Sequence, residues 1–205
     1  IFQQVPGLAQ LMNLDDLMKH LPVRDADAYK NQFGHSLVIG GDHGFGGAAL
    51  MAAEAALRAG SGLVGMATRP THVAAALARQ PEVMVSPVVS GQELEPLLDK
   101  PSVLIVGPGL GRSPWSEQLL QKAVAAELPM VVDADALNII AEGRVVSEPN
   151  GHLWVMTPHL AEAARLLGIT VDEVQADRFA AVRRLQQKYH AVVLLKGAGT
   201  LIACP

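Results

Sequence analysis

Residues 36–67 read SLVIGGDHGFGGAALMAAEAALRAGSGLVGMA. In this stretch an aliphatic run at 36–40 is followed by a glycine-rich turn, an alanine-rich helical segment and a second aliphatic run at 62–67. The order predicts a strand, a crossover helix and a parallel strand. Because these runs are nearly continuous in apolar residues, we expect strands buried on both faces of a mostly parallel sheet, in a three-layer α/β/α sandwich. Further aliphatic runs that fit this pattern occur at 103–107, 130–134, 153–156 and 191–195.

Several helix starts can be read from the sequence. At 113–114 and 157–158 an N-cap residue type, Ser or Thr, precedes a proline that suits the first helical position. The residues TVDE at 170–173 form a capping box, which predicts one helix that continues through Tyr189. A short helix is expected near 14–20.

Composition and charge exclude several classes of function. The chain has 205 residues and a net charge of -4 without long runs of either sign, so we expect no nucleic-acid partner and no polybasic membrane anchor. Cys204 is the single cysteine, which excludes an intrachain disulfide and a cysteine-cluster zinc site. No apolar run reaches the roughly 18 residues of a membrane span, and no signal peptide opens the chain. These features predict a cytoplasmic protein.

The ends of the chain predict a fragment. It begins at Ile1 rather than at methionine, and it stops directly after a strand-like run. We therefore expect a sandwich that is incomplete at its C-terminal end. Residues 1–21 are interpreted as a leading segment or linker, and residues 22–205 as one partial domain.

Two glycine-rich turns, at 40–47 and 107–111, each follow a strand and precede a helix. Such turns should lie at the carboxyl edge of the sheet, where exposed amides suit a phosphate-bearing ligand. The alternative is close helix-on-sheet packing that needs small residues. The first turn also matches a dinucleotide fingerprint, but the next strand ends in Arg69 rather than in an acid. A hydride-transfer enzyme that uses Arg69 on a 2′-phosphate is therefore a minor alternative.

Polar residues at three other strand ends leave alternatives open. Asp133 and Asp135 suit a hard cation, or Asp135 caps a helix while Asp133 bonds loop amides. His159 is expected at the second helical position, where it either faces a ligand or has a purely structural role. The turn Lys196–Thr200 is a hairpin or faces a nucleotide, and it is not a Walker P-loop. The other histidines lack metal-type spacing, so no protein metal ligand is assigned.

Five segments, taken in order, resemble the ADP-dependent NAD(P)H-hydrate dehydratases over about Pro22 to Pro205. The resemblance implies a ribokinase-like fold and a nucleotide-repair enzyme, a hydro-lyase that dehydrates hydrated NADH and NADPH while ADP yields AMP and phosphate. The segments are VIGGDHGFGGAALMAAEAALRAGSGLV, GPGLG, VVDADALN, TPHLAEAARLLG and VVLLKGAGTLIA.

The resemblance also implies site residues and partners. Ala48, Gly109 and His159 would contact the hydrated dinucleotide. Mg²⁺ would accompany the nucleotide, which is ADP in bacterial members and ATP in eukaryotic ones. A fused epimerase domain and a homotetramer are further expectations. The nucleotide would be held by Lys196, Gly197, Ala198, Gly199 and Thr200.

The chain departs from the family pattern in three places. Lys30 is followed by Asn31 rather than glycine, and LAE at 160–162 replaces Pro-Gly-Glu. The Gly-Thr-Gly-Asp segment, which holds the expected catalytic base, is absent and is expected beyond Pro205, so the catalytic residue is left unassigned. Two alternatives remain: a ribokinase-like kinase of a vitamin precursor, and a truncated domain that binds nucleotides without turnover.

Overall fold

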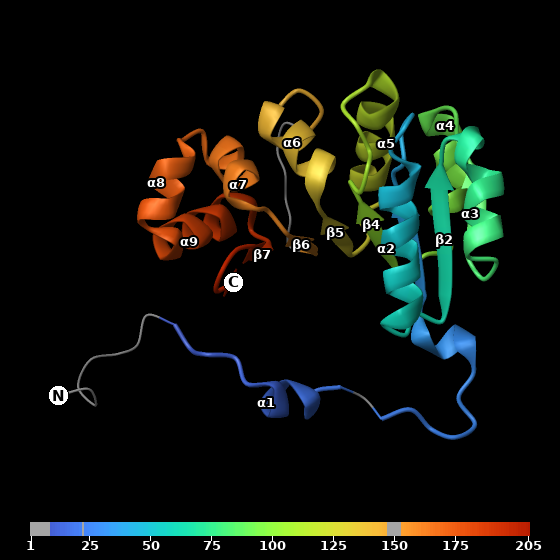
Figure 1. The fold of residues 1–205 in the computed structure, drawn as a ribbon, viewed down its shortest axis with the longest axis horizontal. Helices are drawn as coiled ribbons and strands as arrows, with labels where there is room; N and C mark the ends of the chain where they lie inside the picture. Colours follow the sequence, from blue (N-terminus) through green and yellow to red (C-terminus); the bar gives the residue numbers. More distant parts are fainter. Residues whose placement is uncertain (1–8, 22, 147–152) are drawn as a thin grey trace.

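The computed structural model describes residues 9–21, 23–146 and 153–205, so Pro22, the expected start of the domain, lies outside the described residues. In this part of the chain one sheet has the strand order β3-β2-β1-β4-β5-β6-β7-β8 (Figure 1). All neighbouring strands are parallel except β7 and β8. The strands are β1 (His35–Ile39), β2 (Leu63–Thr68), β3 (Met84–Pro87), β4 (Val103–Val106), β5 (Met130–Val132), β6 (Trp154–Met156), β7 (Val192–Leu195) and β8 (Leu201–Ala203).

Helices connect the parallel strands, as the sequence predicts. Short 3₁₀ turns are η1 (Lys30–Phe33), η2 (Pro70–His72) and η3 (Glu95–Leu97). The α-helices are α1 (Leu14–Met18), α2 (Gly46–Arg58), α3 (Val73–Arg79), α4 (Gly91–Leu94), α5 (Pro114–Ala125), α6 (Ala134–Glu142), α7 (Leu160–Leu167), α8 (Val171–Ala176) and α9 (Arg178–Tyr189).

The strand order reverses between β1 and β4. From β1 the chain proceeds to β2 and β3 on one side, then returns to β4 on the other side of β1 and continues toward β8. The loops after β1 and β4 therefore leave the sheet in opposite directions. In an open α/β sheet such a reversal leaves a crevice outside the carboxyl ends of the strands, where ligands bind.

Alternate residues of β1 face two separate cores. Val38 packs with Ala49 and Ala53 of α2, whose small side chains let the helix lie close to the sheet. Leu37 and Ile39 face the larger core, which also includes side chains of α5, α6, α7 and α9. Helices thus lie on both faces of the sheet and give it the layered α/β architecture.

The expectation that every strand is buried on both faces is wrong for β5 to β7. Val131, Val155 and Val192 share one face of the sheet and are only half-buried. On that face α2 and α3 pack against β1, β2 and β3, and Figure 1 shows both helices at that end of the sheet. Apolar runs alone do not reveal how far the covering helices extend.

The helix starts are partly as expected. Ser113 is the N-cap of α5, and its hydroxyl accepts a hydrogen bond from the amide of Ser116. The capping box of Thr170 with Glu173 is confirmed, but the single helix predicted through Tyr189 is divided into α8 and α9. The division falls at Asp177, whose backbone is not helical and whose carboxylate caps the start of α9 by accepting from the amide of Ala180. Local side-chain bonding outcompetes helix continuation there.

The N-terminal segment lies beside the sandwich rather than within it. Figure 1 shows residues 9–21 running outside the layers, and α1, found within the expected 14–20, contributes no buried residue. Among the described helices, none combines the length and the apolar character that crossing a membrane would require.

Candidate functional site

The two glycine turns meet at the point where the strand order reverses. The amide of Gly41 donates to the carbonyl of Pro108 at 3.2 Å, and the amide of Asp42 donates to the carbonyl of Gly109 at 2.7 Å. Gly109 has a φ of +61°, and a Cβ there would overlap the carbonyl oxygen of Phe45 and lie 3.1 Å from the Cβ of Ala48. The structure therefore brings Ala48 and Gly109 together and requires glycine at 109.

Asp42 is a largely buried carboxylate in this junction that the sequence analysis missed. It accepts hydrogen bonds from Arg69 Nε and Ser113 Oγ, both at 2.8 Å, and from the amide of His43 at 2.9 Å. Burial alone would raise the pKa of Asp42, but the bonds from Arg69, Ser113 and His43 outweigh it and lower the pKa. An acid directly after a glycine pair at a strand end was the available signal.

Arg69 is engaged inside the protein. Its Nε binds Asp42, and its guanidinium lies 4.2 Å from the ring centre of Trp115. These contacts argue against the alternative in which Arg69 binds a 2′-phosphate, because the guanidinium would have to leave a buried partner.

Asp133 and Lys196 form an ion pair at the ends of β5 and β7. Lys196 Nζ lies 2.7 Å from Asp133 Oδ1, and the amide of Lys196 donates to the carbonyl of Pro158 at 2.8 Å. Three loops, after β5, β6 and β7, are thereby joined. The alternative in which Asp135 caps α6 is wrong, because the N-cap position is Asp133. Asp135 instead accepts a hydrogen bond from the amide of Gly111 at 2.9 Å, which connects the start of α6 to the second glycine turn.

His159 caps α7 instead of occupying its second position. Helix α7 begins at Leu160, so the predicted start at Thr157–Pro158 is wrong. The Nδ1 of His159 accepts from the amides of Ala161 and Glu162 at 3.1 and 3.3 Å. In the neutral ring Nε2 therefore carries the proton. The side chain is 52% exposed, and Nε2, which lies 3.4 Å from Glu162 Oε1, is the nitrogen that can donate to a ligand in place of that carboxylate.

The turn Lys196–Thr200 connects β7 to β8 as an antiparallel hairpin, one of the two interpretations left open. Arg178 supports it from α9 by donating to the carbonyls of Ala198 and Gly199, both at 2.8 Å. The role of this turn in nucleotide binding stays a prediction.

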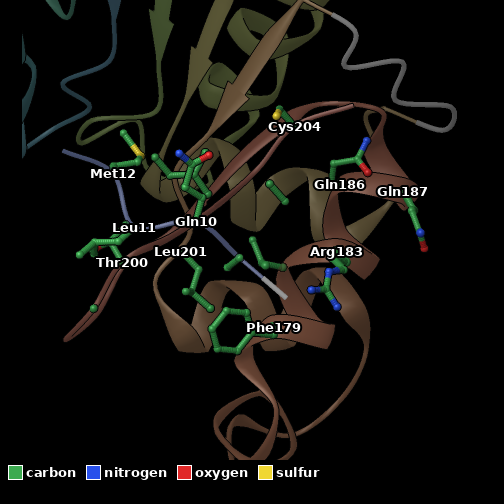
Figure 2. A pocket seen from close by; sticks show the side chains of 15 residues that line it. Gln10, Leu11, Met12, Phe179, Arg183, Gln186, Gln187, Thr200, Leu201 and Cys204 are labelled. Atoms are coloured by element: carbon green, nitrogen blue, oxygen red, sulfur yellow. The ribbon is translucent and has the colours of Figure 1, made fainter. Parts of the chain in front are cut away.

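A cavity of about 950 Å³ lies beside this hairpin. Figure 2 shows Phe179 and Leu201 on its wall. Arg183 and Met12, the latter from the N-terminal segment, also line it. Gly199 and Thr200 of the hairpin line the same cavity. So do further residues of 9–12, α9, β8 and the position after β8: Ala9, Gln10, Leu11, Val182, Gln186, Gln187, Ile202, Ala203 and Cys204.

The described residues offer no group of three or more His, Cys, Asp or Glu side chains that could hold a metal ion. Mg²⁺ commonly uses one or two carboxylates together with substrate phosphates and water. Asp133, whose side chain is partly exposed at the end of β5, is a carboxylate that fits this kind of shared site. Asp133 therefore suits an ion that is shared with a nucleotide phosphate.

Glycine loops at a strand-order reversal define an open α/β protein that binds a ligand at the carboxyl edge of its sheet. A family model described as NAD(P)H-hydrate dehydratase matches residues 36–205. The chain belongs to this family.

Relatives and solved structures agree with that assignment. The chain is 52% identical over 201 residues to the bifunctional NAD(P)H-hydrate repair enzyme Nnr of Coxiella burnetii, covering 98% of this chain and 40% of the relative. It is 42% identical over 194 residues to the enzyme of the same name from Escherichia coli, covering 95% and 37%. The chain thus spans about two fifths of the length of these relatives.

Two solved structures share the fold. A ribokinase-like superfamily protein from Enterococcus faecalis has a TM-score of 0.82 at 29% identity, covering 94% of this chain and 68% of that one. The ADP/ATP-dependent NAD(P)H-hydrate dehydratase of Bacillus subtilis, co-crystallized with ATP and Mg²⁺, has a TM-score of 0.77 at 25% identity, covering 93% and 68%. These likenesses confirm the predicted ribokinase-like fold and the predicted family.

Proposed function

We propose that this chain binds hydrated NADH or NADPH together with an adenine nucleotide and Mg²⁺, and that it serves the nucleotide-dependent dehydration of the hydrate. The family match carries the proposal, because it spans 36–205 and so includes every residue proposed for the site. The adjacency of Ala48 and Gly109 at the strand-order reversal supports it.

Each part of the rim has a proposed role. Ala48 and Gly109 form a surface of small residues for the hydrated dinucleotide, and His159 donates to it through Nε2. The turn 196–200 holds the nucleotide, with Lys196 exchanging its bond to Asp133 for the phosphates. Mg²⁺, when bound, would neutralise phosphate charge. Positioning and charge stabilisation are the main demands of phosphoryl transfer.

The proposed chemistry converts a poor leaving group into a good one. The oxygen of the C6 hydroxyl on the hydrated ring attacks the β-phosphorus of ADP as its proton is lost to solvent, and AMP departs. The lone pair of the ring nitrogen then expels phosphate from C6, and loss of the C5 proton restores the double bond. We assign no acceptor for that proton among the described residues.

Turnover of hydrated NADH by the protein as encoded tests the proposal. With ADP and Mg²⁺ present, we expect the near-ultraviolet absorbance of the reduced nicotinamide to return, with one AMP and one phosphate released per ring. A stable phosphoester without recovery of absorbance would instead support the kinase alternative. Binding of ADP and hydrate by isothermal titration, without turnover, would identify a binding domain and refute catalysis by this chain.

Two further proposals concern the whole protein. The first listed relatives are bifunctional repair enzymes, which supports an epimerase activity acting on the same hydrates, in the same polypeptide or as a partner. A homotetramer is proposed on the family resemblance, and light scattering of the protein as encoded would test it.

A further inference from the structure

Asp42 lies in the first glycine turn, and its main chain forms hydrogen bonds within that turn and to the second one. Its amide donates to the carbonyl of Gly109 at 2.7 Å, and its carbonyl accepts from the amide of Phe45 at 2.8 Å. Phe45 in turn immediately precedes α2, whose first turn contains Ala48. His72 Nε2 lies 3.1 Å from the same carbonyl oxygen of Asp42. The backbone at 42 therefore lies between the two segments that are proposed to contact the hydrate.

The side chain of Asp42 also connects the first glycine turn to neighbouring loops. Oδ2 accepts from Ser113 Oγ, which follows the second glycine turn, and Oδ1 accepts from Arg69 Nε, which follows β2. Both charged side chains are mostly buried, at 12% and 15% exposed. The Arg69 guanidinium is held in turn against Trp115. A buried charge is costly without its partners, so all three loops are constrained together.

We propose that Asp42 is a positioning residue that holds Gly109 against Ala48 in the geometry that the hydrate requires. The inference rests on the proposed function. It predicts an effect on one ligand only, because the nucleotide turn follows β7, and β4, β5 and β6 separate β7 from β1 in the sheet. General destabilisation would not distinguish the two ligands.

Asp42→Asn and a matched control test the idea. The control is Glu54→Gln, because Glu54 pairs with Arg79 Nε at 2.8 Å and its side chain is also 12% exposed. Glu54 lies in the third turn of α2, away from the glycine turns. We expect Asp42→Asn to raise KM for hydrated NADH by about tenfold or more, with KM for ADP unchanged. Glu54→Gln should change neither value.

Hydrogen–deuterium exchange gives a readout that does not need turnover. Loss of the Asp42 charge should increase deuterium uptake by peptides that cover 107–111, whereas uptake in the hairpin at 196–200 should stay unchanged. Ser113→Ala removes the hydroxyl that bonds Asp42, together with its cap of α5, and serves as the second variant if Asp42→Asn does not fold. It should shift KM for the hydrate in the same direction.

The outcomes separate the two ideas. No turnover by the unmodified protein refutes the proposed function, and the positioning role is then judged by exchange at 107–111. An unchanged KM for the hydrate in a folded Asp42→Asn protein overturns the inference while leaving the function intact. Equal rises in the KM values of both ligands would also overturn it, because they would indicate a general structural effect.

Discussion

Replacing Gly109 with alanine tests whether the two glycine turns approach as closely as the structure requires. Two effects add in this variant. The φ of +61° costs an L-residue about 1–2 kcal/mol. The new Cβ would also overlap the carbonyl oxygen of Phe45 and lie 2.9 Å from its Cβ. Crowding of that kind costs about 1–3 kcal/mol. The expected loss in the free energy of unfolding is therefore about 2–5 kcal/mol.

Gly143→Ala is the matched control. Gly143 has a nearly equal φ of +68°, but a Cβ there would meet nothing within 4 Å. Its cost should be limited to the conformational part, about 1–2 kcal/mol. The difference between the two variants, about 1–3 kcal/mol, isolates the close approach of the turns. For a chain of this size the difference corresponds to about 2–12 °C in Tm.

Urea unfolding followed by tryptophan fluorescence measures both variants. The two tryptophans, Trp115 and Trp154, are each 5% exposed and should respond strongly to unfolding. Gly109→Ala should also weaken binding of the hydrate, whereas Gly143→Ala should not. Equal losses of stability in the two variants would refute the reasoning, because the carbonyl of Phe45 would then offer no obstacle at position 109.

Three further predictions concern charged and polar groups. Lys196→Met should weaken ADP binding about tenfold in isothermal titration while leaving hydrate binding unchanged, as expected for the loss of one charged hydrogen bond. His159→Ala should cost about 1 kcal/mol of stability through loss of the cap, whereas His159→Asn should retain the cap. If both variants also bind the hydrate equally poorly, Nε2 of His159 contacts the ligand. Normal binding of the hydrate by His159→Asn would show that the residue only caps the helix. The pKa of Asp42 is held below its ordinary value of 3.8, so its ion pair stabilises the fold above that pH and the contribution declines as pH falls below about 4. Asp42→Asn should flatten the dependence of stability on pH in this acidic range, and an unchanged slope would contradict the assignment.

The sheet was largely predictable because its signals are local. Each of β1, β2, β4, β5, β6 and β7 coincides with an apolar run of the sequence. Strand β3 was missed because it is an edge strand that is partly exposed and ends in Pro87, so it lacks the continuous apolar pattern. The break between α8 and α9 was missed because a capping aspartate within an apolar periodicity gives no strong signal of its own.

The site was predictable only at its turns. Glycine patterns placed two turns at the carboxyl edge, and the structure joins them at the strand-order reversal. The side-chain pairs that organise this edge are distant in sequence, with Ser113 71 positions after Asp42 and Lys196 63 positions after Asp133. No local pattern predicts which distant partner a single aspartate will find. The residue types predicted which edge of the sheet holds the site, and tertiary packing decided which side chains contact one another there.

The two ion pairs at this edge differ in how readily they can exchange partners. Asp42 and Arg69 are mostly buried, so separating them would leave uncompensated charges in a poorly solvated place. Asp133 and Lys196 are about one-third exposed, where water and phosphate can replace either partner at little cost. A phosphate that approaches the turn at 196–200, which we propose holds the nucleotide, can therefore attract Lys196 without separating Asp42 from Arg69. This difference in burial divides the edge into a fixed part at β1 and β4 and an adaptable part at β5 and β7.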